Sequence, residues 1–322
     1  MAYSKEMYIK AERILENRKK TAESEALLRS EEIKAKIPEL AKIQSELAKI
    51  GIEISRLLFY KDNAPQRLEE LKSKSLALIE KRNKLLNENG LDENVLKPDY
   101  TCAACEDKGF IENRMCSCMK QVLKDLMRKE ISKLAPIDSC TFDNFDTSLY
   151  DNTTLENGIN PREKAERALG ASRKYAQNFS RESKNLLFLG ATGLGKTHLS
   201  LAIANVVINR AYSVCYGTSY NICEDLRNES FGRTDYITYT KNKVLDADLL
   251  ILDDLGTETD NQYNTASISN IINSRMLSGK PTVISTNYEY DELLEKYDQR
   301  VASRLTGEYI TITLFGKDIR NK

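Results

Sequence analysis

The most informative part of the sequence is Leu186-Leu-Phe-Leu189-Gly190-Ala-Thr-Gly-Leu-Gly-Lys196-Thr197-His198. Gly190–Thr197 matches the pattern G-x-x-x-x-G-K-[ST] at every fixed position. Four apolar residues precede the pattern, and an apolar helical run follows it. A buried strand, a glycine-rich loop and a helix form the context in which this pattern binds phosphate. The alternative is a chance glycine-rich turn, and the number of matched positions disfavours it.

The loop has the chemistry to bind ATP with Mg²⁺. Its glycines let the backbone curl so that consecutive N–H groups face phosphate oxygens, and the helix N-terminus adds favourable partial charge. Lys196 is expected to reach the β- and γ-phosphates, and the Thr197 hydroxyl to ligate Mg²⁺. The expected nucleotide-binding residues are Gly190, Ala191, Thr192, Gly193, Leu194, Gly195, Lys196, Thr197 and His198.

His198 is the only histidine in the chain and directly follows Thr197. A Ser-His-Asp triad would have to use it, and its position at a helix start argues against that. We therefore expect a packing role beside the nucleotide rather than a catalytic one.

Two carboxylates follow another buried strand. The run Leu249-Leu-Ile-Leu-Asp253-Asp254 lies about 57 residues after Lys196. In enzymes with this type of loop, an acid at such a strand end holds Mg²⁺, often through water. We assign that role to Asp253 and the orientation of the attacking water to Asp254. Two acids after a strand are weak evidence for such a site by themselves. Their distance of about 57 residues from Lys196 makes the evidence strong.

Two polar segments complete the expected catalytic set. Pro281–Asn287 is another buried strand, and Asn287 at its end can hydrogen-bond the attacking water or the γ-phosphate. Further on, Arg300 and Arg304 lie one helical turn apart on one face. One of them is a candidate arginine finger for a neighbour's ATP, and the sequence does not rank them. The alternative for such an arginine is a solvated helix face.

Residues from about 141 onward alternate apolar strand patterns with helical patterns. The expected strands are Leu186–Leu189, Ser213–Tyr216, Leu249–Leu252 and Thr282–Ser285. This alternation implies βαβ units and a parallel sheet. The sequence thus predicts an α/β domain over residues 141–322.

Residues 1–97 are rich in Lys, Glu, Leu and Ile and predict a helical domain. Apolar residues recur every three or four positions at Ile33, Ile37, Leu40, Ile43, Leu47, Ile50, Ile54 and Leu57, which predicts one helix face. A second such run is Leu68, Leu71, Leu78, Leu85 and Leu86. Asp62–Pro65 predicts the turn between the two helices, and Asn89-Gly90 the end of the second. A self-packed helical bundle and a docking surface for a partner protein both fit this pattern.

Residues 98–140 contain a cysteine cluster with the spacing C-x₂-C-x₁₀-C-x-C, made by Cys102, Cys105, Cys116 and Cys118. Two close thiolate pairs suit tetrahedral Zn²⁺, and Gly109 lies where a turn must bring the pairs together. The alternatives are an iron–sulfur site, a redox pair or unligated thiols. A short helix around Val122–Leu134 follows, and the other three cysteines read as buried small hydrophobes.

Charge and composition narrow the function classes. Lys+Arg and Asp+Glu are equal at 48 each, so the formal charge is zero. A protein that coats duplex DNA is usually basic, so any nucleic-acid contact should be local. The N-terminus MAYSKEMYIK lacks a signal-peptide core, and no stretch approaches the roughly 18 apolar residues of a membrane span. Because no secretory signal is present, the seven cysteines are expected to be reduced thiols or metal ligands instead of disulfides. We expect a cytoplasmic protein without a membrane partner.

The ordered motifs GATGLGKT, LLILDDLG, STN, QRVASRL and FGKDIR resemble those of bacterial replicative-helicase loaders of the DnaC/DnaI type, which are AAA+ ATPases. The resemblance covers residues from about 98 onward, and residues 1–97 are similar in character only. It implies a helicase-binding domain over residues 1–97, a zinc module over 98–140, as in DnaI-like loaders, and an AAA+ core over 141–322. The implied site residues are Lys196 and Thr197 as Walker A, Asp253 and Asp254 as Walker B, Asn287 as sensor 1, Arg304 as the arginine finger and Arg320 as sensor 2.

The resemblance also implies contact with single-stranded DNA. Loaders of this family carry an extra helical element, here about Ser219–Lys243, that lines the inner channel of a spiral. Phe231 would stack on a base, and Arg233 or Lys241 would meet phosphate. From the residues alone, Phe231 reads as a core residue. The loop Thr257–Tyr263 is a second candidate surface.

Two features depart from many AAA+ proteins. The second Walker B acid is Asp254 instead of Glu, so its shorter side chain reaches less far toward water. The sequence ends six residues after Gly316, so a C-terminal helical lid is not expected. Both features favour an ATP-controlled switch over a processive motor.

The leading interpretation is a helicase loader. Its N-terminal helices would grip a hexameric replicative helicase of the DnaB type. Its ATPase domain would assemble head to tail, and the ATP state would control the hold on helicase and single-stranded DNA.

Two other interpretations remain. A transposition helper ATPase of the IstB kind would bind duplex DNA and a transposase, but the cysteine cluster and the long helical N-terminus favour the loader. A nucleotide-binding interaction protein without turnover is disfavoured by the set Asp253, Asp254, Asn287 and Arg304.

Hydrolysis of ATP by the wild-type protein is expected to be slow, because Asp254 reaches less far toward the attacking water than Glu would. Lys196→Ala is expected to remove phosphate release. Single-turnover rates of both proteins test this. A wild-type rate comparable with fast AAA+ motors would contradict the switch, and equal release by both proteins would reject ATP hydrolysis.

Overall fold

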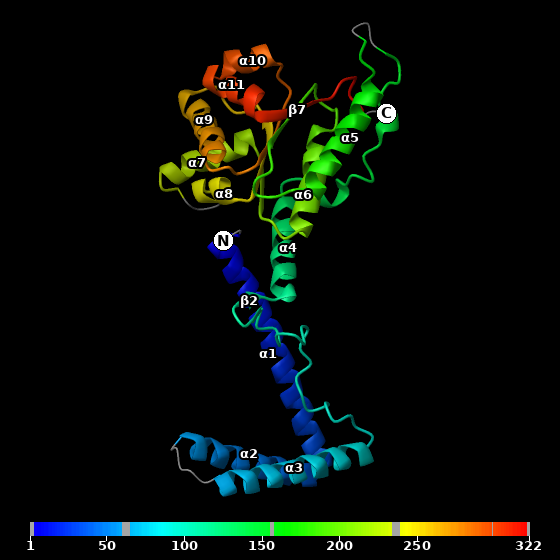
Figure 1. The fold of residues 1–322 in the computed structure, drawn as a ribbon, viewed down its shortest axis with the longest axis vertical. Helices are drawn as coiled ribbons and strands as arrows, with labels where there is room; N and C mark the ends of the chain where they lie inside the picture. Colours follow the sequence, from blue (N-terminus) through cyan, green and yellow to red (C-terminus); the bar gives the residue numbers. More distant parts are fainter. Residues whose placement is uncertain (1–2, 60–64, 155–157, 234–238, 298, 321–322) are drawn as a thin grey trace. The chain divides into compact units, whose positions relative to one another are not determined.

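The computed structural model describes residues 3–59, 65–154, 158–233, 239–297 and 299–320 (Figure 1). It divides into two compact units. The sheet unit consists of the described residues of Met1–Ala11 and Lys120–Lys322, and the helical unit is Glu12–Met119. None of the helices in these ranges is long and apolar enough to cross a membrane.

The sheet unit contains a five-stranded parallel sheet in the order β4-β5-β6-β3-β7. The strands are β3 (Asn185–Leu189), β4 (Val214–Thr218), β5 (Leu249–Leu255), β6 (Thr282–Thr286) and β7 (Tyr309–Thr313). The four predicted strands are confirmed, and the parallel α/β fold with them. Strand β7 was not predicted. It lies at an edge of the sheet and contains exposed Ile310 beside buried Tyr309, so it lacks the continuous buried apolar run of a central strand.

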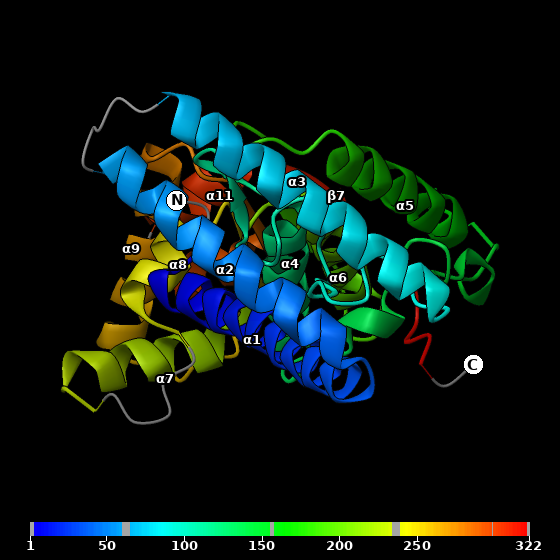
Figure 2. The same cartoon turned by 90° about the horizontal axis from the view of Figure 1, so that it is seen from below.

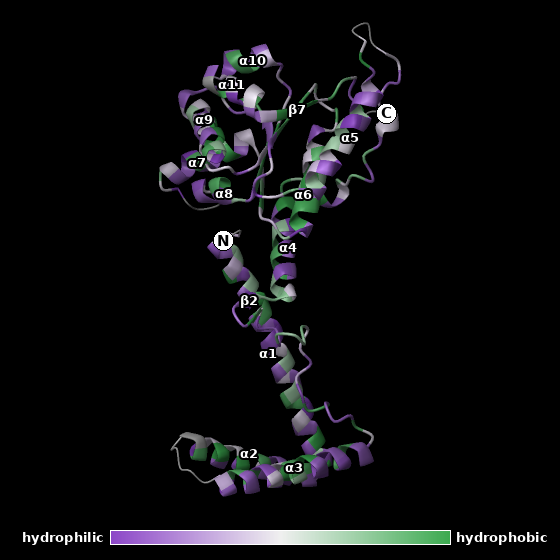
Figure 3. Cartoon of the chain, in the orientation of Figure 1, coloured by the Kyte–Doolittle hydropathy of each residue, from purple (hydrophilic) through white to green (hydrophobic). Residues whose placement is uncertain are grey.

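Helices cover both faces of the sheet. Helices α5 (Pro161–Gln177) and α6 (Lys196–Asn209) lie on one side (Figure 1). The other side carries α7 (Ser219–Ser230), α8 (Lys241–Asp246), α9 (Gln262–Leu277), α10 (Tyr290–Lys296) and α11 (Gln299–Glu308). Helix α6 is hydrophobic over most of its length (Figure 3), because it is buried nearly all round.

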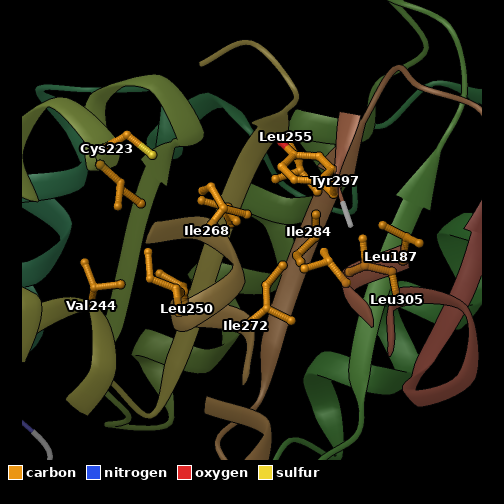
Figure 4. Close-up of a cluster of buried hydrophobic side chains, with 14 of the residues drawn as sticks. Leu187, Cys223, Val244, Leu250, Leu255, Ile268, Ile272, Ile284, Tyr297 and Leu305 are labelled. Atoms are coloured by element: carbon orange, nitrogen blue, oxygen red, sulfur yellow. The ribbon is translucent and has the colours of Figure 1, made fainter. Parts of the chain in front are cut away.

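The main core lies between the sheet and helices α7–α11. Leu250 of β5 and Ile284 of β6 meet Ile268 and Ile272 of α9, and all four side chains are fully buried (Figure 4). Burial on both faces explains why the central strands read as unbroken apolar runs. This core fixes the strands whose carboxyl ends carry the polar residues of the candidate site.

The helical unit contains most of α1 (Lys5–Lys36), together with α2 (Pro38–Phe59) and α3 (Pro65–Glu88). The prediction of one continuous helix across Ile33–Leu57 is wrong, because α1 ends at Lys36 and α2 begins at Pro38. Proline lacks an N–H and clashes inside a helix, but it fits the first position of a new one. Of the predicted turn, Asp62, Asn63 and Ala64 lie outside the described residues.

Helices α2 and α3 pack side by side (Figure 2). As predicted, α3 begins at Pro65 and ends just before Gly90, whose φ is 71°. A small core of Ile33, Leu40 and Leu86 holds this end of the unit together. Other large apolar side chains of the unit stay exposed, namely Leu27, Leu28, Ile52 and Leu76.

A short hairpin follows the helices. It consists of β1 (Phe110–Ile111) and β2 (Arg114–Met115). Helix α4 (Ser117–Ser132) comes next and begins five residues before the predicted Val122. Two 3₁₀ turns, Ile137–Ser139 and Thr147–Leu149, lead to α5.

Ile284→Ala should destabilise the sheet unit by about 2–5 kcal/mol, because it leaves a cavity in the central strand β6. Ile310→Ala is the matched control on edge strand β7, where the side chain is 46% exposed, and it should cost below about 1 kcal/mol. Urea unfolding of both variants measures the difference. Equal losses would mean that the two strands contribute alike to the core.

Candidate nucleotide-binding site

Three glycines shape the loop between β3 and α6. Gly190, Gly193 and Gly195 adopt φ values of 141°, 78° and 80°, which side chains disfavour. A Cβ at Gly190 would clash with the Leu314 carbonyl, and one at Gly195 with the Phe145 ring. The glycines are therefore required by both backbone conformation and close packing.

Lys196 lies at the centre of the loop and is 5% exposed. Its ammonium donates to the carbonyls of Gly190 (2.6 Å) and Ala191 (2.8 Å) and to Asn287 Oδ1 (2.7 Å). Burial lowers the pKa of Lys196, and the Asp254 carboxylate opposes that shift. The structure thus brings Asn287, at the end of β6, directly to the loop lysine.

Asp253 ends the apolar part of β5 and is 1% exposed. Its carboxylate accepts hydrogen bonds from Thr197 (2.9 Å), Tyr216 (2.8 Å) and Ser285 (2.5 Å). These donors are all neutral, so the buried negative charge still favours a cation. The carboxylate and the Thr197 hydroxyl are adjacent hard oxygens, the ligand type that Mg²⁺ prefers. The residues present fit a magnesium ion.

Asp254 has a left-handed backbone with φ of 50°. Its N–H donates to Ser285 Oγ (3.0 Å), and its carbonyl accepts from Ser219 (2.9 Å) and Thr257 (2.8 Å). Backbone strain of this kind is found mostly at functional sites. Burial and then the neighbouring Asp253 raise the pKa of Asp254, so its carboxylate is a better proton acceptor than an ordinary aspartate.

The phosphate-binding loop and the start of α6 pack against residues that precede α5. The Tyr150 hydroxyl donates to the Leu194 carbonyl at 2.6 Å. His198 Nε2 contacts the Thr141 carbonyl at 2.8 Å, and its ring meets the Phe145 ring edge-on. These contacts support the proposed packing role of His198. Ala191 and Thr192 are exposed on the outside of the loop.

The other candidate residues lie on separate elements. Arg304 of α11 lines a groove of about 530 Å³ against α9, with Gln262, Asn270 and Asn273 among its neighbours. The side chain of Arg300 lies outside what the structure describes. Arg320 follows β7 and forms an ion pair with Asp318.

The candidate DNA-contacting residues lie around the end of α7 and the start of α8. Phe231 ends α7 and is 71% exposed, so the expectation of a core residue from the residues alone is wrong. Arg233 and Lys241 are exposed as well. The loop Thr257–Tyr263, the second candidate surface, is mostly exposed, and within it Glu258 is buried.

Sequence reasoning missed two donors to the Asp253 carboxylate, Tyr216 and Ser285. The strand register places Thr218 opposite Asp253, so Tyr216 is near enough to reach it. Ser285 lies two residues before Asn287 on β6. The only signal available for either was a polar atom inside an otherwise apolar strand.

The four clustered cysteines of the helical unit lie together, with their sulfurs within 4.8 Å of one another. Cys102 Sγ is 3.7 Å from Cys116 Sγ, and Cys105 Sγ is 3.3 Å from Cys118 Sγ. A tetrahedral zinc with bonds of about 2.3 Å places its sulfurs about 3.8 Å apart. The Gly109 N–H donates to Cys105 Sγ at 3.3 Å. The residues present fit one zinc ion.

The sequence is similar to that of known proteins over part of its length. The family model of the IstB-like ATP binding protein matches residues 165–305. The replicative helicase loader DnaC of Escherichia coli K12 is 29% identical over 157 residues, which are 49% of this chain and 64% of DnaC. DnaC of Buchnera aphidicola subsp. Baizongia pistaciae is 28% identical over 177 residues, 54% of this chain and 72% of that protein. The chain thus spans less than two thirds of the Escherichia coli relative.

Two solved structures are similar to part of the chain. The crystal structure of the DnaC helicase loader is 25% identical, with a TM-score of 0.43, over 54% of this chain and 98% of that one. The crystal structure of DnaI is 24% identical, with a TM-score of 0.41, over 57% of this chain and 93% of that one.

The wild-type protein should contain about one zinc ion per chain, because four thiolates complete one tetrahedron. Cys105→Ser should lose most of that zinc, whereas Cys223→Ser, a buried cysteine outside the cluster, should retain it. Metal analysis of the purified proteins tests this. Iron in place of zinc, or equal loss in both variants, would contradict the assignment.

Proposed function

From the premise that residues 165–305 form an IstB/DnaC-like ATP-binding domain, we propose that this chain loads a replicative DNA helicase under the control of ATP. The observation that carries the proposal is the contact of Lys196 with Asn287 and of Thr197 with Asp253. Residues from three distant parts of the sequence thus meet at one phosphate-binding loop. The identity to DnaC points to helicase loading as the use of this site.

ATP hydrolysis follows from the roles that these residues can take. Thr197 and Asp253 would hold a Mg²⁺ ion, whose charge stabilises the negative charge that develops on the phosphates. Lys196 would exchange its carbonyl acceptors for phosphate oxygens while Asn287 stays beside it. Asp254, with its raised pKa, would accept a proton from the attacking water or orient that water.

Oligomerisation would complete the site. Arg304 lines the open groove on α9 and α11, away from the loop of its own chain, and could serve the ATP of a neighbouring copy. Single-stranded DNA would be bound by Phe231, Arg233 and Lys241, which are exposed. The exposed Phe231 ring can stack on a base, and the positive charges of Arg233 and Lys241 can contact phosphate.

The helical unit would bind the helicase. It exposes Leu27 (63%) and Leu28 (64%) beside each other on α1, and exposed apolar side chains of this size are typical of protein interaction sites. The match to an IstB-like family model supports a transposition helper ATPase as the alternative. The cysteine cluster and the three long helices favour the loader.

A pull-down of purified replicative helicase by the full-length chain tests the proposal. Wild type should retain the helicase hexamer, and Leu27→Asp with Leu28→Asp should reduce capture about tenfold or more, as for a buried interface anchor. Lys20→Asp, an exposed polar position on the same helix, is the matched control and should bind as wild type. Capture of a transposase without any helicase would favour the alternative function.

A further inference from the structure

The segment after β7 lies against the phosphate-binding loop. The Leu314 N–H donates to the Leu189 carbonyl at 2.9 Å, and the Ile319 N–H donates to the Gly193 carbonyl at 3.1 Å. A Cβ at Gly193 would clash with the Asp318 carboxylate. Two backbone hydrogen bonds therefore fix this segment, with Asp318 directly on the central glycine of the loop.

Asp318 holds the Arg320 guanidinium in a fork. Nε of Arg320 donates to Oδ1 at 3.0 Å, and Nη2 donates to Oδ2 at 2.5 Å. The Arg320 N–H also donates to Oδ1, at 2.9 Å. A long exposed arginine samples many rotamers, and a bidentate carboxylate offsets the entropy lost on fixing one of them. The Nη1 group stays outside this fork.

The ion pair holds Arg320 next to the nucleotide site. The N–H of Ile319, the residue before Arg320, donates to the Gly193 carbonyl, and the Asp318 carboxylate that holds the guanidinium lies against Gly193. The guanidinium is therefore held beside the loop that receives phosphates.

We propose that Asp318 is a positioning residue, which holds Arg320 beside the phosphate-binding loop so that its free amino group favours the triphosphate over the diphosphate. The inference rests on the proposed ATP-binding function. A purely local role is the alternative, in which Asp318 only shapes the turn that leads to Arg320.

The direction in which removal of the Asp318 charge changes the preference for the triphosphate distinguishes positioning of Arg320 from a purely local role. The Asp318 carboxylate is held ionised, because the hydrogen bond from Arg320 lowers its pKa to about 2. On its own, a negative charge beside the loop repels phosphates, so its removal would tighten binding, most of all for the more highly charged ATP. A weaker preference for the triphosphate after removal therefore identifies positioning of Arg320, since simple electrostatics predicts the opposite.

The test compares the affinities of the full-length protein for fluorescent ATPγS and fluorescent ADP in the presence of Mg²⁺. Asp318→Asn should lower the preference for ATPγS over ADP by about two- to fivefold, the range of an exposed ion pair. Arg320→Gln should lower it at least as much, and the double variant no further, because the two residues act as one unit. An unchanged or stronger preference in Asp318→Asn, or additive losses, would overturn the proposal.

Two controls keep the outcomes distinct. Lys317→Gln changes the charge of the same segment by one unit at an exposed position and should keep the wild-type preference; a loss equal to that of Asp318→Asn would reject positioning. Lys196→Ala should bind neither nucleotide. Normal binding by Lys196→Ala would reject the proposed function, whereas its failure to bind beside an unchanged Asp318→Asn would reject only the present inference.

Discussion

A buried carboxylate near the carboxyl end of strand β5 sets the arrangement of the site. Asp253 accepts hydrogen bonds from Thr197 on α6, Tyr216 on β4 and Ser285 on β6. A carboxylate so far from water needs hydrogen-bond donors, and a bound cation stabilises it further. Three elements that are distant in sequence therefore meet at this point.

The order of the strands makes that meeting possible. Because β3 lies beside β6 and β6 beside β5, the carboxyl ends of three parallel strands share one edge of the sheet. Those ends carry the phosphate-binding loop, Asn287, and the pair Asp253 and Asp254. Ligands bind at such edges in open α/β sheets because the loops there leave a crevice. The core between the sheet and α9 keeps these ends in register.

Some elements of the fold could be predicted from the sequence, and others could not. The central strands were predictable because both of their faces are buried, whereas β7 was missed because it is an edge strand and only partly buried. The break at Pro38 was overlooked because apolar residues keep their helical spacing across it. Phe231 was misjudged from its residue type, since the chemistry of an aromatic side chain does not fix its burial.

The phosphate-binding loop, the acidic strand end and the cysteine cluster could be identified from the sequence, because each consists of residues that are close along the chain. Glycine at positive φ, a carboxylate after an apolar run and paired thiols all carry local signals. The contacts of Tyr216 and Ser285 with Asp253, and of Asp318 with Gly193, became visible only in the folded chain. Those contacts depend on strand register and on the path of a distant segment, and packing over the whole sheet sets both.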